Sequence, residues 1–362
     1  MSPTRVATSN LFSPIKVGTM QLNHRVVMAP MTRLRTSNAS AVLKVTKEYY
    51  SQRASTPGTF LISEGTVIAP RATGFPGAPG VWSGEQIVAW KEVVDAVHAK
   101  GSYIYLQIAA MGRVAQPSVL KSYDPAYDVA GAGDIPVAGG EVPRPMTVEE
   151  IQASIGLFAQ AATNAVHKAG FDGVELHGAN GFLIDQFIQD VSNNRTDEYG
   201  GSMENRVRYA LEVVDAVVKV VGEERTSIRL SPWAKDQDMG MKAPVPTFTH
   251  LISRLKNTHP NLAYIHLIQS RDLDDLKQSN EIFFNTWLPR PLVVADGFTR
   301  ETALKLAERE ALLVAFGRQF ISNPDLPLRL KSDIPLSVYD RTTFYGGDES
   351  GKGYIDYTFA ST

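Results

Sequence analysis

Eight short, mostly apolar runs, separated by longer amphipathic segments, constrain the fold of this chain more than any other feature. The runs lack strict alternation, which is typical of parallel strands buried on both faces. Eight strand–helix units in succession predict an α/β fold, a (β/α)8 TIM barrel, as a single domain over residues 1–362. The expected strands are Val26–Ala29, Phe60–Ser63, Tyr103–Gln107, Gly173–His177, Ser227–Leu230, Tyr264–Leu267, Leu292–Ala295 and Leu313–Phe316.

Helix signals lie between these strands. Thr147 and Glu150 form a capping-box pattern, and the apolar stretch behind them ends at Gly170. Thr299 suits the N-cap of a later helix. The expected helices include Glu85–Lys100, Thr147–Ala169, Asn205–Val221 and Thr299–Glu308.

Three long loop insertions interrupt this rhythm: Pro70–Gly84, Ala115–Pro145 and the polar stretch Gln269–Asn285. Each follows a strand, so in a barrel each lies at the C-terminal mouth, where active sites are found. The aromatic-rich segment Leu326–Thr362 is expected to be a closing tail packed on the barrel.

Composition excludes several classes of protein. With 36 Lys and Arg against 38 Asp and Glu, the net charge of −2 argues against a nucleic-acid partner. The chain has no cysteine, which removes disulfides, thiolate catalysis and iron–sulfur clusters. No apolar run reaches the roughly 20 residues of a membrane span, and Met1–Asn10 lacks the apolar core of a secretory signal. We therefore expect a cytoplasmic protein with no membrane partner.

His177 ends the fourth expected strand and is followed by Gly-Ala-Asn-Gly. A lone histidine is usually structural, but here the glycines permit a sharp turn, and His177 and Asn180 can converge two N–H donors on one oxygen. Such a pair polarises a carbonyl whose oxygen gains negative charge. Other polar residues at or just beyond strand ends are Thr32, Glu64, Gln107, Arg229, His266 and Arg318.

Several rival chemistries lack their residues. No second histidine or carboxylate stands at metal-ligand spacing from His177, so we expect no metal. None of the expected strands ends in a lysine, which disfavours a Schiff base, and a phosphosugar enzyme would need a lysine or paired carboxylates.

An anion site is indicated after the seventh and eighth strands, where this fold usually binds phosphate. Gly297 and Gly317 allow backbone amides to approach a phosphate, and Arg318 can bind it in bidentate fashion. Arg229 ends the fifth strand; it either forms a surface ion pair or stabilises an anion such as a reduced flavin.

Almost end to end, the sequence resembles the Old Yellow Enzyme family of FMN-dependent ene-reductases, and within it fungal members, including those of ergot-alkaloid biosynthesis. The stretches that carry the resemblance are Leu11–Pro14, Met28–Arg33, Ser63–Gly65, His177–Gly181, Asp185–Phe187, Asn194–Ser202, Glu204–Arg206, Phe316–Ser322 and Gly353–Tyr357.

The resemblance implies a role for each matching residue. His177 and Asn180 would bind the substrate carbonyl, and Phe344 and Tyr345 would border flavin and substrate. The implied FMN contacts are Pro30, Met31, Thr32, Gly65, Gln107, Arg229, Gly297, Phe298, Gly317 and Arg318. The implied reaction passes a hydride from NAD(P)H through FMN to the β-carbon of a small-molecule enone or enal. The oligomeric state, monomer or homodimer, stays open.

Three positions depart from the family pattern. Phe182 replaces a tyrosine that donates a proton, so either water compensates or the protein is a flavin-dependent isomerase without net reduction. Ala109 replaces a tryptophan and would enlarge the pocket, unless Trp82, Trp233 or the long loop refills it. Asp296 replaces a glycine, and we expect its carboxylate to point away from phosphate. A non-catalytic flavin-binding protein is a further alternative, against which the retained site residues argue.

Overall fold

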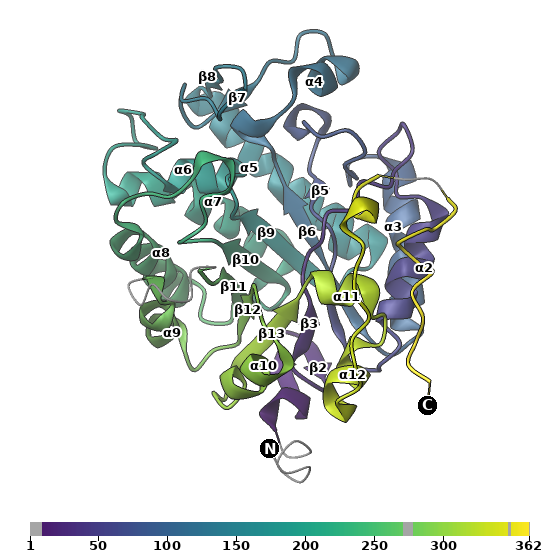
Figure 1. Cartoon of the computed structure of the whole chain (residues 1–362). Coiled ribbons are helices and arrows are strands. Elements are labelled where there is room, and N and C mark those ends of the chain that lie inside the picture. Colours follow the sequence, from purple (N-terminus) through teal and green to yellow (C-terminus); the bar gives the residue numbers. More distant parts are fainter. Residues whose placement is uncertain (1–8, 271–277, 347–348, 362) are drawn as a thin grey trace.

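The computed structural model describes residues 9–270, 278–346 and 349–361, and its centre is a closed barrel of parallel strands (Figure 1). The barrel closes because β3 pairs with both β4 and β13. In barrel order the strands are β3 (Val26–Met28), β4 (Phe60–Ile62), β6 (Tyr103–Ala109), β9 (Gly173–Gly178), β10 (Thr226–Leu230), β11 (Tyr264–Ile268), β12 (Leu292–Ala295) and β13 (Leu312–Phe316). All eight expected strands are confirmed, with ends that differ by two residues at most.

A helix follows each strand and covers the outside of the barrel. In order these are α2 (Lys44–Arg53), α3 (Gly84–His98), α5 (Val148–Thr163), α7 (Met203–Val221), α8 (Pro244–Thr258), α9 (Glu281–Trp287), α10 (Arg300–Leu306) and α12 (Leu326–Ser332). The four expected helices are confirmed. The capping box before α5 is present, because Thr147 Oγ1 accepts from Glu150 N and Glu150 Oε2 accepts from Thr147 N. A π-helical turn (Asn164–Ala169) continues α5 to Gly170.

Two of the expected loops need correction. The insertion Ala115–Pro145 is partly ordered, with α4 (Pro117–Tyr123) and the short paired strands β7 (Ala130–Gly131) and β8 (Arg144–Pro145) at the top of Figure 1. The expected loop Gln269–Asn285 is wrong at its end, because α9 begins within it and buries aromatic side chains. Residues 271–277 of that stretch lie outside the described residues.

The N-terminal end of the barrel is packed with apolar side chains. Phe60, Tyr105 and Tyr264 meet there, with ring centroids 5.1 to 5.7 Å apart. A hairpin that the sequence did not predict, β1 (Ile15–Val17) and β2 (Met20–Leu22), covers them with buried apolar residues. Polar interior residues therefore gather at the opposite, C-terminal end.

The C-terminal tail packs on the barrel as expected, beside α2 (Figure 1). Tyr354 stacks on Tyr49 with ring centroids 4.0 Å apart, and Arg53 lies 3.7 Å from the Tyr49 ring. Arg33, fully buried, donates from Nε to Phe344 O at 2.8 Å. We call Arg33, Tyr49, Arg53 and Tyr354 the tail clamp; it fixes Phe344 relative to the barrel.

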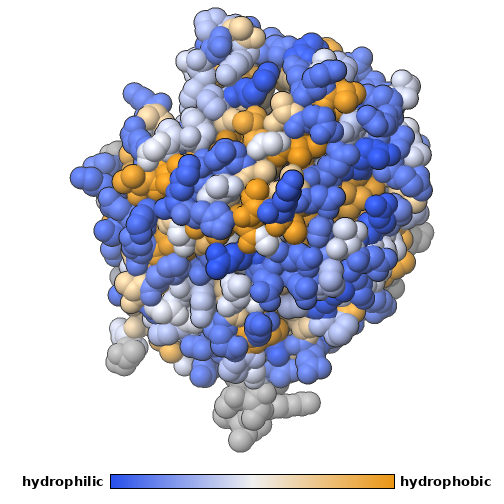
Figure 2. Space-filling model, turned by 180° about the vertical axis from the view of Figure 1, so that it is seen from behind, coloured by the Kyte–Doolittle hydropathy of each residue, from blue (hydrophilic) through white to orange (hydrophobic). Residues whose placement is uncertain are grey.

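The face behind the view of Figure 1 is mainly hydrophilic, with apolar residues visible in patches across its middle (Figure 2). Within the described ranges, none of the helices has the length and apolar character required to span a bilayer.

Candidate active site

A cavity of about 530 Å³ opens at the C-terminal end of the barrel and brings most of the predicted site residues together. Its walls come from the segments that follow β3, β9, β12 and β13, with residues from the tail. The predicted residues that line it are Pro30, Met31, Thr32, Asn180, Arg229, Gly297, Phe298, Gly317, Arg318, Phe344 and Tyr345.

Gly65, Gln107 and His177 converge at the end of the barrel interior. A Cβ on Gly65 would lie 3.3 Å from Gln107 Oε1 and 3.9 Å from His177 Cδ2. The missing side chain at Gly65 therefore keeps the space between these two polar groups open. The parallel register places His177 beside Arg229, which connects this group to the wall of the cavity.

His177 is 5% exposed, and burial, followed by the charges of Arg229 and His266, holds its pKa well below the usual range for histidine. The imidazole is therefore neutral at neutral pH and keeps one N–H to donate. Its Nδ1 finds no hydrogen-bond partner among the described residues. Asn180 has a left-handed backbone with φ of 55° and lines the cavity wall. A buried polar atom without a partner at a cavity indicates a ligand-binding group.

Glu175 lies beneath this group and was missed by the sequence reasoning. Its carboxylate accepts from Gln107 Nε2 at 2.8 Å, Tyr264 Oη at 3.0 Å and His266 Nδ1 at 2.9 Å. Burial alone would raise its pKa, but His266, Arg229 and Gln107 together lower it, so Glu175 is ionised. An inward-facing position two residues before His177 was the available signal.

Gly297 and Gly317, the glycines predicted to bind phosphate, both line the cavity. Gly297 has φ of 75°, and nothing lies within 4 Å of the place where a Cβ would stand. Arg318 lies 5.9 Å from the ring of Tyr339, and Arg341, another cation, also lines the cavity. Sequence reasoning missed Tyr339 and Arg341, because only the folded tail brings them there.

The departures from the family pattern have distinct surroundings. Phe182 packs against His177, with ring centroids 4.4 Å apart, and edge-on against Phe75. Ala109 is buried and pairs with Val67. Asp296 lines the cavity with φ of 96°, a conformation that favours glycine. The direction of its carboxylate, and an enlarged pocket at Ala109, stay predictions.

The two tryptophans that were alternatives for filling the space at Ala109 each have a partner on another segment. Trp82 packs edge-on against Tyr123 of α4. Trp233 donates from Nε1 to Asn280 Oδ1 at 2.7 Å, beside α9.

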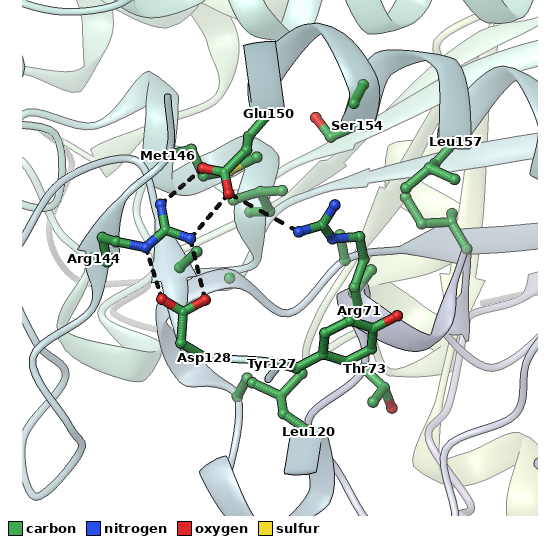
Figure 3. A pocket seen from close by; sticks show the side chains of 18 of the residues that line it. Arg71, Thr73, Leu120, Tyr127, Asp128, Arg144, Met146, Glu150, Ser154 and Leu157 are labelled. Atoms are coloured by element: carbon green, nitrogen blue, oxygen red, sulfur yellow. Dashed lines mark hydrogen bonds and ion pairs between the residues drawn. The ribbon is translucent and has the colours of Figure 1, made fainter. Parts of the chain in front are cut away.

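A second, smaller cavity of about 90 Å³ lies outside the barrel, between α4, α5 and the loop before β7 (Figure 3). Arg144 bridges Asp128 at 2.7 Å and Glu150 at 2.8 Å, while Arg71 lies 3.9 Å from Glu150. The ion pairs attach the long insertion to α5. None of the predicted site residues lines this cavity.

No group of three or more histidine, aspartate or glutamate side chains suited to a metal ion occurs in the part of the chain that the structure describes. The main site offers other chemistry: a neutral histidine and an asparagine as N–H donors, arginine cations, and open space at Gly297. These features together define a TIM-barrel oxidoreductase site with room for a phosphorylated flavin.

Comparisons with known proteins agree with this class. The model of the NADH:flavin oxidoreductase / NADH oxidase family matches residues 10–337. The "probable inactive reductase easA" of Epichloe festucae var. lolii is 47% identical over 98% of this chain and 96% of its own. The "chanoclavine-I aldehyde reductase fgaOx3" of Penicillium roqueforti is 47% identical over 98% and 97%. The crystal structure of Old Yellow Enzyme from Pichia sp. AKU4542 superposes with a TM-score of 0.90 at 35% identity, covering 98% and 95%.

The chain belongs to the NADH:flavin oxidoreductase / NADH oxidase family and is an oxidoreductase of the Old Yellow Enzyme type. FMN is its cofactor and a nicotinamide its hydride donor. The residues present fit FMN, because the cavity wall carries the cations Arg229, Arg318 and Arg341 for its anionic groups, with open space at Gly297.

Proposed function

We propose that this protein reduces the C=C bond of an α,β-unsaturated aldehyde or ketone with NADH or NADPH, in fungal specialised-metabolite biosynthesis. The observation that carries the proposal is the neutral His177, whose Nδ1 has no partner among the described residues and which lies beside Arg229, three residues before Asn180 of the cavity wall.

In this proposal FMN supplies the hydride transfer. His177 and Asn180 donate hydrogen bonds to the substrate carbonyl, whose oxygen gains negative charge when the β-carbon receives hydride. Because His177 is neutral, it binds the oxygen without giving up its proton. Arg229 contributes a fixed positive charge for anionic reduced FMN.

By the same proposal, the remaining cofactor contacts are divided between two ends of the cavity. Pro30, Met31 and Thr32 border the ring, with Gly65 and Gln107 at its polar edge. The phosphate end is formed by Gly297, Phe298, Gly317 and Arg318, and the cover over flavin and substrate by Phe344 and Tyr345.

The names of the relatives bear on the substrate. The Penicillium roqueforti relative is named an aldehyde reductase, which supports an enal. The Epichloe relative is named probably inactive, which keeps a non-catalytic flavin protein as the alternative. This chain retains Thr32, Gln107, His177, Asn180 and Arg229, so we favour activity.

The test is turnover by the FMN-loaded protein across a panel of enals and enones, with products identified by mass spectrometry. We expect His177→Ala and Asn180→Ala each to lower kcat/KM about 100-fold. His167→Ala, on the exposed end of the π-helical turn, is the matched control. A wild-type protein that carries FMN but oxidises no NAD(P)H with any member of the panel contradicts the proposal.

A second candidate, isomerisation of an enal or enone without net reduction, is favoured by Phe182, which cannot donate a proton to the α-carbon. Its signature is a product isomer formed with catalytic reduced FMN and no consumption of NAD(P)H, followed by NMR.

Cytoplasmic location and the choice between monomer and homodimer remain predictions. Cell fractionation tests the first, and light scattering tests the second.

A further inference from the structure

Asp185 is a fully buried carboxylate on α6 (Leu183–Ile188), outside the cavity lining. It accepts from Gly181 N at 2.9 Å and from Gln189 Nε2 at 2.9 Å, and Ser231 Oγ lies 3.5 Å from Oδ2. Gly181 follows Asn180 in the same turn, and Gln189 lies just past the end of α6. Ser231 is hydrogen-bonded to Asn180 itself. A buried carboxylate is retained where its acceptor capacity is used in full.

Ser231 connects Asp185 to the substrate-binding turn. Its Oγ accepts the backbone N–H of Asn180 at 2.8 Å, and its position directly after β10 fixes it to the barrel. Asn180 needs such support, because a left-handed backbone is uncommon for a residue other than glycine.

Gln189 extends the connection to a second mouth loop. Its Oε1 accepts from Gly240 N at 3.0 Å and Met241 N at 3.1 Å, so the amide cannot turn over without losing both bonds. Gln189 Nε2 therefore always meets Asp185 Oδ1 as a donor. Since Gly181 N is also a donor, the site requires two acceptor oxygens, which an ionised carboxylate provides without an O–H of its own.

We propose that Asp185 is a positioning residue, which holds Asn180 in place to bind the substrate carbonyl and couples the turn after β9 to the loop after β10. The role of Asn180 rests on the proposed function; the coupling of the two loops does not.

The charged surroundings of Asp185 give the coupling a pH dependence. Burial raises the pKa of Asp185 to about 7, and Arg113 of the turn Gly112–Val114 is the charged residue that opposes this. Arg113 also donates to Gln237 O, and the charge of Asp238 raises the pKa of Arg113 against the effect of burial. Each carboxylate oxygen accepts one N–H, so protonation of either oxygen would set an O–H against a donor, and enone binding should weaken as the pH falls below about 7.

The experiment compares Asp185→Asn with Asp190→Asn in the FMN-loaded protein. Asp190 is exposed and lies just past α6, so it makes the same change of charge without the buried contacts. Hydrogen–deuterium exchange should rise in residues 179–184 and 231–241 of Asp185→Asn only. Cyclohex-2-enone, which does not titrate, should bind the oxidised wild type several-fold more weakly at pH 6 than at pH 8, and Asp185→Asn weakly at both.

Unchanged exchange in both loops of Asp185→Asn overturns the inference, whatever the enone does. If exchange rises as expected but the wild type turns over no enone, the proposed function fails and the coupling stands. Should Asp185→Asn not fold, Ser231→Ala removes the bond to Asn180 together with the contact to Asp185, and should raise exchange in residues 179–184; no rise there also overturns the inference.

Discussion

At the scale of single residues, Phe182 decides under the proposed function whether the α-carbon is protonated after hydride transfer. Its ring packs against His177, so a hydroxyl at this place would lie near the bound carbonyl compound. We predict that Phe182→Tyr raises the rate of net reduction severalfold and lowers any isomer product, because it restores a proton donor. Product ratios measured by NMR in D2O check this. Equal rates and ratios in both proteins would refute our account of protonation.

Asp296 combines backbone strain with a carboxylate in the cavity lining. Its φ of 96° costs a non-glycine residue roughly 1 kcal/mol. We predict that Asp296→Gly stabilises the apoprotein by about that amount and also tightens FMN binding, since a negative charge leaves the phosphate end. Asp333→Gly, at an exposed residue with φ of 57°, is the control that relieves strain without changing FMN affinity. Fluorescence titration and urea unfolding measure both quantities.

At the scale of elements, the tail clamp fixes the position of Phe344, which lines the cavity. Arg33 donates to three tail carbonyls, those of Thr343, Phe344 and Gly353. Its guanidinium also lies 5.0 Å from the Tyr49 ring and 4.7 Å from the Tyr354 ring. A lysine cannot reproduce this planar set of donors. We predict that Arg33→Lys lowers the free energy of unfolding by about 2 kcal/mol and weakens FMN binding roughly tenfold. Arg71→Lys, at an exposed arginine, should change neither; an Arg33→Lys protein with wild-type FMN affinity would disconnect the tail from the cofactor.

The elements differ in how far the sequence predicted them. The barrel strands were predictable, because apolar runs buried on both faces leave a strong local signal. The β1–β2 hairpin and α6 were not, since three- and six-residue elements carry little periodicity and form through tertiary contacts. The mouth residues came mostly from family resemblance. Glu175 and Asp185 were missed as site residues, because what defines them is hydrogen-bond partners on other segments.

At the scale of the whole molecule, buried groups set the pH dependence of stability. Burial raises the pKa of Glu64 to about 7, although it accepts backbone N–H groups from Arg33 and Leu34. A raised carboxyl pKa gives stability that is present at low pH and is lost as the pH rises from the unfolded value of 4.5 to about 7. Burial lowers the pKa of His24 to about 4 and that of His177, so their contribution is lost as the pH falls below about 6.5.

We therefore predict that Glu64→Gln removes part of a loss of stability between about pH 4.5 and 7, and that above pH 7 the variant and the wild type change in parallel. Glutamine keeps an acceptor for the two backbone N–H groups but carries no charge. Urea unfolding of the apoprotein between pH 5 and 9 measures the effect. A Glu64→Gln protein whose stability changes between pH 5 and 7 just as that of the wild type does would show that Glu64 is not the group responsible.

The β1–β2 hairpin, which seals the lower end of the barrel, has a kinetic consequence. Substrates and products must therefore enter and leave through the open C-terminal end of the barrel. Under the proposed function, the nicotinamide must leave before the enone can approach the same flavin face. Double-reciprocal plots at several fixed enone concentrations should then be parallel lines. Each of the two substrates, in excess, should inhibit by binding to the flavin state that reacts with the other substrate.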